Sequence, residues 1–228
     1  TGDRNYGIYS SGTVDNYGNM DLKSGNGVGN IGIYSTKGVA TNWATIDTGK
    51  TNKTTKSYGI GMATGYYDGA VSRNQGTVIN KGTINVTEDN SIGMYAVGRG
   101  SVAINNGEIH LSGRNSIGMF VDQEAVGINN GLITSTADAV GAIGAVATNR
   151  AIFKNYGTIN ILPQAGVGVL LKKDGILEEY SSPSATVAQK GSSRITAEAR
   201  IKTPQLSKTG KELADGSVEI ISLSGDSI

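Results

Sequence analysis

The sequence predicts an all-β protein that forms a right-handed, three-sided parallel β-helix, with about 25 residues per coil and roughly nine coils. Three observations predict this fold class. Two short sequence phrases recur in phase at one period, each period holds about three runs of strand-forming residues, and glycine and asparagine separate those runs. A propeller blade needs about 40 residues or more, and a leucine-rich repeat would show its own leucine spacing, so the period favours a β-helix.

The first phrase has the form Asn-x-Gly followed by an alternating run. It occupies residues 80–86, 105–111, 129–135 and 155–161, so successive copies begin 25, 24 and 26 residues apart. Stacked coils place each asparagine over its copy, where amides hydrogen-bond along the stack and tolerate left-handed backbone angles. The expected corner ladder consists of Asn80, Asn105, Asn129 and Asn155.

The glycine of the first phrase should provide either a positive φ or a close approach of two backbones. These glycines are Gly82, Gly107, Gly131 and Gly157. The alternation that follows places one isoleucine column inside, formed by Ile84, Ile109, Ile133 and Ile159, with the residue two positions later also inside. The residues between them, which include His110, should face solvent.

The second phrase resembles Ser-Ile-Gly-Met-Tyr and recurs at residues 91–95, 116–120, 139–143 and 166–170. Alternation predicts an inward set of Ile92, Met94, Ala96, Ile117, Met119, Val121, Val140 and Ala142. It predicts an outward glycine column of Gly7, Gly32, Gly59, Gly93, Gly118, Gly141 and Gly168. Beside it lies an outward stripe of Tyr9, Tyr34, Gly61, Tyr95, Phe120, Ile143 and Leu170.

The outward stripe has two interpretations. It is a platform for a sugar or a partner protein, or its aromatic rings cover the neighbouring glycines and complete the sheet surface. The second interpretation needs no ligand.

The chain is expected to be a single β-helical segment over residues 1–228, with regular coils at about 1–171 and looser coils at 172–228. Extra residues in a coil must leave it as loops. We expect such loops at residues 41–57, which carry Trp43, and at residues 172–183 and 203–216.

Composition excludes several classes of function. A net charge of +1 gives no attraction to nucleic acid, and the absence of cysteine excludes disulfides and thiolate metal sites. With His110 as the single histidine, no histidine-based triad or multi-histidine metal site is expected, and no cofactor is expected either. The chain has no apolar run long enough to span a membrane and no signal peptide, so we expect it to be part of a longer protein.

Charged residues occupy comparable turns of successive coils with alternating sign. They are Asp68, Arg99, Asp122, Glu124 and Arg150. A polysaccharide lyase or hydrolase built on a β-helix would need clustered carboxylates on one face. Alternating signs favour a solvated charge ladder over a catalytic pair.

Some of these phrases resemble the passenger repeats of autotransporters, in particular the large fusobacterial type V outer-membrane adhesins. The phrases are Asn-Ser-Ile-Gly-Met-Tyr-Ala at residues 90–96, Asn-Ser-Ile-Gly-Met-Phe-Val at 115–121 and the repeated Asn-x-Gly run at 74–85. The resemblance covers about residues 1–171. It implies a surface-exposed stalk, exported through a C-terminal β-barrel that this sequence lacks, with a role in virulence through attachment to other bacteria or host cells.

The sequence therefore leads to a non-enzymatic adhesin segment that presents loops to a surface protein or glycan. The alternatives are a polysaccharide-processing enzyme and a pure spacer within a larger passenger. The candidate binding residues are Trp43, Tyr9, Tyr34, Tyr95, Phe120, Lys172, Lys173, Glu178, Glu179 and Tyr180.

Overall fold

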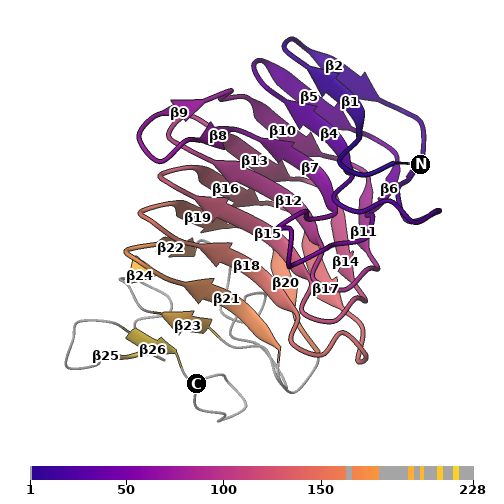
Figure 1. Ribbon diagram of the computed structural model, residues 1–228. Helices are drawn as coiled ribbons and strands as arrows, with labels where there is room; N and C mark the ends of the chain where they lie inside the picture. The colour runs from indigo at the N-terminus through magenta and orange to yellow at the C-terminus, as the bar shows by residue number, and fades with distance from the viewer. Residues whose placement is uncertain are drawn as a thin grey trace.

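The computed structural model describes residues 2–162 and 166–179, together with the strand backbones at 195–197, 201–202, 210–212 and 218–220. The chain is an all-β parallel solenoid of about seven turns with about 25 residues per turn (Figure 1). Each complete turn contributes one strand to each of three sheets, here named A, B and C. No helix of the described part is long and apolar enough to cross a membrane.

The strands of each sheet follow one another along the solenoid. Sheet A contains β1 (Tyr6–Ser10), β4 (Ile31–Ser35), β7 (Ile60–Thr64), β12 (Ile92–Val97), β15 (Ile117–Asp122), β18 (Ile143–Ala147), β21 (Val167–Leu171) and β23 (Ile195–Ala197), all parallel. Two antiparallel strands complete it, β26 (Val218–Ile220) and β25 (Gly210–Glu212).

Sheets B and C contain only parallel pairs. Sheet B contains β2 (Val14–Asn16), β5 (Val39–Asn42), β10 (Thr77–Asn80), β13 (Val102–Asn105), β16 (Val126–Asn129), β19 (Ile152–Asn155), β22 (Ile176–Glu179) and β24 (Ile201–Lys202). Sheet C contains β3 (Met20–Asp21), β6 (Thr45–Asp47), β11 (Thr83–Val86), β14 (Glu108–Leu111), β17 (Leu132–Ser135) and β20 (Thr158–Asn160). A hairpin of β8 (Tyr66–Tyr67) and β9 (Ser72–Arg73) leaves the third turn (Figure 1).

The parallel solenoid and its period are confirmed, whereas the right hand and the total of nine coils stay predictions. The loop predicted at residues 172–183 is wrong in its first part. Lys173 and Asp174 form a tight turn with φ of 46° and 61°, and β22 then pairs with β19 in register. The turn repeats the two-residue left-handed geometry of Asn149 and Arg150 one coil earlier, so no extra residues need to be extruded. Residues 180–183 and most of 203–216 lie outside the described residues.

The interior column of sheet C is confirmed. Ile84, Ile109, Ile133 and Ile159 are each 0% exposed and stack in register. The residues between the inward positions of these strands, His110 among them, are partly exposed. The strict period of two therefore sets which face of sheet C is buried.

A ladder of buried asparagine amides runs along the end of sheet B. Each Nδ2 donates to the Oδ1 of the asparagine one coil further on, at 2.8 to 3.0 Å, through Asn16, Asn42, Asn80, Asn105, Asn129 and Asn155. The ladder thus begins two coils before the four asparagines expected from the phrase. The expected left-handed backbone is absent at these positions and occurs instead at Asn74, Asn90, Asn115 and Asn149. The ladder asparagines are the last residues of regular strands. Their side-chain hydrogen bonds therefore explain why asparagine occurs there, and a left-handed backbone does not.

In the four copies of the first phrase, the glycine two residues after the ladder asparagine allows the backbones of neighbouring coils to approach closely. A Cβ on Gly107 would lie 2.1 Å from the carbonyl oxygen of Gly82, and one on Gly131 would lie 2.0 Å from that of Gly107. Neither glycine has a positive φ. Of the two roles expected for this column, close approach is the one that applies.

The glycine column of sheet A faces the interior, contrary to the prediction. A Cβ on Gly93 would lie 3.0 Å from Cγ2 of Ile109 in sheet C, and the buried Met94 follows directly. Ile92 and Ile117 instead join Tyr95 and Phe120 in a separate cluster. Strict alternation fails here because two consecutive residues, the glycine and the methionine, both point inward.

Two members of the glycine column were also assigned to the wrong residues. The register pairs Ile31 with Ile60 and Ile117 with Ile143. Gly61 and Gly144 therefore belong to the column, whereas Gly59 directly precedes β7 and Gly141 lies in a turn. Gly141 has a φ of 77°, and its neighbour Val140, which we expected inside, is 45% exposed. Ala142 is buried as expected.

Candidate functional site: the outer face of sheet A

The outer face of sheet A carries two adjacent apolar columns, here called the apolar strip. One column is Tyr6, Ile31, Ile60, Ile92, Ile117, Ile143 and Val167. The other column is Tyr9, Tyr34, Ala63, Tyr95, Phe120, Val146 and Leu170. With strands about 4.8 Å apart, the strip is about 29 Å long. It is a continuous apolar layer, in which Ile60, Ala63, Ile92 and Val146 are buried, Tyr6 and Tyr9 are exposed and the other residues are partly exposed.

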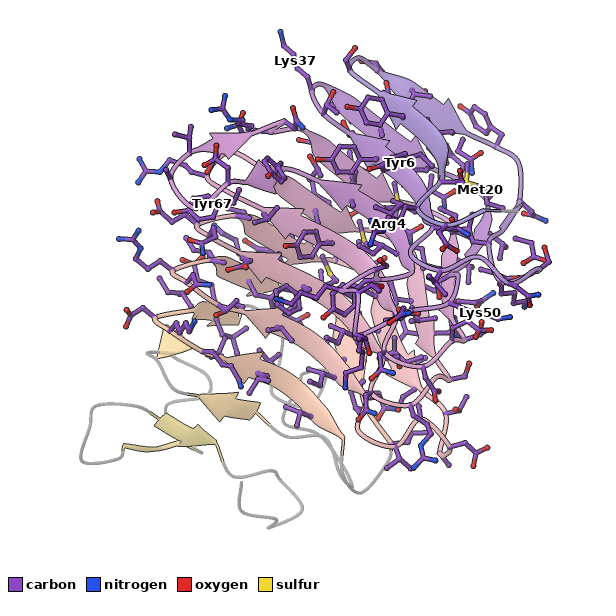
Figure 2. All side chains as sticks on the ribbon, in the orientation of Figure 1. Arg4, Tyr6, Met20, Lys37, Lys50 and Tyr67 are labelled. Carbon is purple, nitrogen blue, oxygen red and sulfur yellow. The ribbon has the colours of Figure 1, made fainter. Side chains whose placement is uncertain are left out.

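The aromatic rings of the apolar strip form two groups. Tyr9 stacks on Tyr34 with ring centroids 5.5 Å apart, and Tyr6 meets Tyr9 edge-on at 5.3 Å. Further along, Tyr95 and Phe120 lie 5.6 Å apart. Figure 2 shows Tyr6 near the N-terminal end of this face. The rings contact one another, so covering of outward glycines does not explain the strip, because those glycines point inward.

Burial disfavours ionisation of the Tyr34 and Tyr95 hydroxyls. Desolvation raises the pKa of Tyr34 and of Tyr95 above the usual tyrosine value. The Tyr34 hydroxyl donates to the carbonyl oxygen of Gly65 at 2.9 Å, which ties the ring to the turn before the hairpin. These groups are therefore hydrogen-bond donors over the physiological pH range.

A pocket of about 430 Å³ lies at the N-terminal end of the apolar strip. Tyr6, Ile31 and Ile60 contribute from the sheet, and the loop before β7 contributes Tyr58 and Lys56. The loop folds back on itself through paired hydrogen bonds between the backbones of Asn52 and Ser57, at 2.8 and 2.9 Å. It thereby forms one wall of the pocket.

Arg4 lines the same pocket from the first turn. Its Nε donates to Oγ of Ser57 at 2.9 Å, and its backbone N–H donates to the carbonyl oxygen of Val28. Arg4 and Lys56 both have left-handed backbones, with φ of 56° and 52°. Two cations thus line the same pocket as the tyrosines and isoleucines.

Trp43 lies away from the apolar strip and outside any loop, although the sequence placed it in one. It occupies the corner between β5 and β6, directly after the ladder asparagine Asn42. Its ring stacks on Tyr17 with centroids 6.1 Å apart, Nζ of Lys81 lies 4.1 Å from its centroid, and its Nε1 donates to Asp15. Both faces of the indole are therefore occupied by the chain's own side chains.

Three other predicted binding residues, Lys172, Lys173 and Glu178, are not members of the apolar strip. Lys172 and Lys173 are exposed in the turn after β21. Glu178 lies in β22, where Oε2 is 3.1 Å from Nζ of Lys154, and Glu179 ends that strand. Tyr180 lies outside the described residues. The structure thus brings Tyr9 together with Tyr34, and Tyr95 with Phe120, and it places Trp43, Lys172, Lys173 and Glu178 outside the strip.

The sequence interpretation missed four residues that line the pocket, namely Arg4, Tyr6, Lys56 and Tyr58. The tyrosines had a signal, since Tyr6 starts a copy of the second phrase and Tyr58 precedes another. Arg4 and Lys56 had none, because they are far apart in sequence and meet only through the loop fold.

The charged residues on the turns form an ion-pair ladder over part of the predicted set. Glu124 pairs with Arg99 through Oε2 and with Arg150 through Oε1, both at 2.6 Å. The hydrogen bond from Arg99 is the main cause that lowers the pKa of Glu124. Asp68 is not part of this ladder, because it pairs with Arg73 in the β8–β9 hairpin. Among residues 2–162 and 166–179, no three His, Asp or Glu side chains gather as a metal ion would require.

The Asp68 carboxylate is expected to titrate at about pH 2. The backbone N–H groups of Val71 and Ala70 lower its pKa most, at 2.8 and 3.0 Å, and Arg73 adds to them. A lowered pKa stabilises the hairpin above the unfolded value of about 3.9, and this stabilisation is lost as the pH falls toward 2. A carbon-13 NMR titration of the carboxyl measures this. Arg73→Gln should raise the midpoint only slightly, and a midpoint near 4 in the unaltered chain would contradict the assignment.

Comparison with known proteins gives one family similarity. Residues 23–131, just under half of the chain, match the family model described as the BigA third pectate lyase-like domain. The match covers the second to fifth turns and includes Tyr34, Tyr95 and Phe120 of the apolar strip. Neither the curated proteins nor the solved structures contain a significant match.

Proposed function

We propose that this chain is a non-enzymatic segment of a bacterial surface adhesin, and that its apolar strip binds a protein on another bacterium or on a host cell. BigA is a bacterial surface protein of the adhesin-like kind, so the family similarity supports a surface-exposed location. The recurring phrases support the more specific assignment to an autotransporter passenger of the type V class. In this proposal the solenoid is right-handed and continues to about nine coils.

The observation that carries the proposal is the apolar strip itself. Exposed apolar patches larger than a few hundred square ångströms are rare on monomeric soluble proteins and mark interaction sites. A strip about 29 Å long and two side chains wide matches the central part of a standard protein interface, which buries about 800 Å² on each partner. Exposed tyrosines such as Tyr9, at 61%, are typical anchors of such interfaces.

The proposal differs from its two alternatives in ways that can be measured. A polysaccharide-processing enzyme would shorten a glycan chain, which reducing-end assays on a panel of polysaccharides detect. A pure spacer would show no saturable binding of the isolated chain to any cell. We expect saturable binding without cleavage.

Binding should depend on the central aromatic pair. The double substitution Tyr95→Ser and Phe120→Ser is expected to weaken binding of the biotinylated chain to cells by about tenfold or more, because buried aromatic anchors dominate interface energies. Flow cytometry over a concentration series measures the apparent affinity. Cells should include several bacterial species and a host epithelial line, since the partner is not fixed by the chain.

The matched control carries two substitutions on the outer face of sheet C, His110→Ser and Thr134→Ala. These positions are partly exposed on the same coils, so they test whether any surface change has the same effect. Circular dichroism confirms that both variants keep the solenoid. Equal binding of the two double variants would argue against the apolar strip as the binding surface.

A further inference from the structure

We infer that the pocket at the N-terminal end of the apolar strip receives a protein segment that carries a carboxylate beside an apolar or aromatic side chain. This inference rests on the proposed function, since it names the chemistry of the partner at one end of the same surface. The pocket would then fix the orientation of the partner along the strip.

The first argument is the unused positive charge. Nε of Arg4 is held by Ser57, but within the described part of the chain no group accepts from its two Nη atoms. Nζ of Lys56 likewise has no acceptor among the described residues. None of the described residues that line the pocket carries a carboxylate, and the nearby Asp3 uses its Oδ1 to accept from the backbone N–H of Val28. With Nε fixed by Ser57, the two Nη atoms of the Arg4 guanidinium are available to donate to a carboxylate.

The second argument is the surface between the two cations. Tyr6 is 47% exposed and Tyr58 is 38% exposed, and the partly exposed Ile31 and the buried Ile60 also line the pocket. An apolar or aromatic side chain of the ligand would be covered by these residues. The ligand therefore needs an acidic group and an apolar group in close proximity.

A protein segment satisfies this requirement better than a charged sugar. The pocket opens onto the apolar strip, because Ile31 and Ile60 belong to both. Only a partner with further apolar side chains can cover the strip beyond the pocket, whereas a saccharide would leave most of it in water. Charge complementarity at one end with apolar contact along the rest is typical of protein interfaces.

The test selects ligands from a random dodecapeptide library displayed on phage, with the complete 228-residue chain as bait. We expect the selected peptides to pair Asp or Glu with Phe, Tyr, Trp or Leu. Synthetic versions of these peptides should bind about tenfold more weakly to the double variant Arg4→Gln and Lys56→Gln, as fluorescence anisotropy measures. Added salt should weaken binding to the unaltered chain and have little effect on the double variant.

The matched control is the double variant Lys37→Gln and Arg114→Gln, which removes the same charge from an exposed lysine and an exposed arginine outside the pocket. Equal weakening by both double variants, selection of peptides without acidic residues, or selection of no peptide overturns the inference. Binding of N-acetylneuraminic acid that depends on Arg4 and Lys56, without any peptide binding, also overturns it and assigns the pocket to sugar acids. If Arg4 and Lys56 variants bind cells normally while the Tyr95 and Phe120 variant does not, the pocket inference fails and the proposed function stands.

Discussion

Alanine at position 118 should destabilise the solenoid by about 3 kcal/mol, near the upper end of the usual cost of overpacking. The new Cβ would lie 2.4 Å from the carbonyl oxygen of Gly144 and 2.8 Å from Cγ2 of Ile133. Gly144 belongs to the next coil of sheet A, and Ile133 lies in sheet C on the opposite side of the interior. The stacked coils hold both in place, so relief requires the sheets to separate. Urea denaturation followed by circular dichroism should show a lower midpoint.

Gly12→Ala provides the control for Gly118→Ala. No atom lies within 4 Å of the position of its Cβ, and its φ is not positive. We expect no loss, or a small gain in stability because alanine restricts the unfolded chain. This pair of variants also tests the direction of the glycine column. A tolerated alanine at position 118 would mean that the glycine faces solvent, as strict alternation predicts.

Removing one amide from the asparagine ladder should be about as costly. Asn105→Ala takes away the acceptor of Asn80 Nδ2 and the donor to Oδ1 of Asn129 and to the carbonyl oxygen of Leu132. Each buried polar group that loses its partner costs about 1–3 kcal/mol, and we expect a total of about 3 kcal/mol. The measurement is again the denaturation midpoint.

The adjacent Asn106→Ala variant separates the ladder from a general effect of removing an amide. Asn106 is exposed, and its Oδ1 accepts a hydrogen bond of 2.7 Å from Asn130. After this substitution the exposed Nδ2 of Asn130 can donate to water instead. We therefore expect the free energy of unfolding to change by less than about 0.5 kcal/mol. Similar effects at positions 105 and 106 would show that burial of the ladder contributes little.

The first phrase was predictable because two independent rules agree on it. Alternation and the repeat both place Ile84 and Ile109 inside, and the register aligns them. The second phrase was only partly predictable. Its glycine and methionine both point inward, which strict alternation of strand side chains does not predict. In addition, residues 139–142 resemble the second phrase, but the copy that pairs in register begins three residues after Val140, at Ile143. Whether Gly141 adopts a positive φ is decided by the turn and not by the local sequence.

The aromatic column of the apolar strip was predictable from the sequence, whereas the pocket at the end of the strip was not. The columns of Tyr34, Tyr95 and Phe120 follow from the repeat alone. The cations of the pocket could not be inferred, because Arg4 and Ser57 are 53 residues apart and meet through a loop that interrupts the repeat. Trp43 was assigned to that loop because the interval is long, whereas the extra residues lie after β6.

The asparagine ladder gives the solenoid a direction. Every ladder amide from Asn16 to Asn129 donates toward the C-terminal neighbour, so the side-chain dipoles are aligned head to tail along the axis. Once a coil has folded, the Nδ2–H of its ladder asparagine can donate to the asparagine of the next coil. Each added coil therefore forms the same hydrogen bond as the coil before it. Insertion or deletion of a whole coil would therefore keep the asparagine ladder continuous. An insertion shorter than one coil has to project from the stacked sheets, as the β8–β9 hairpin does.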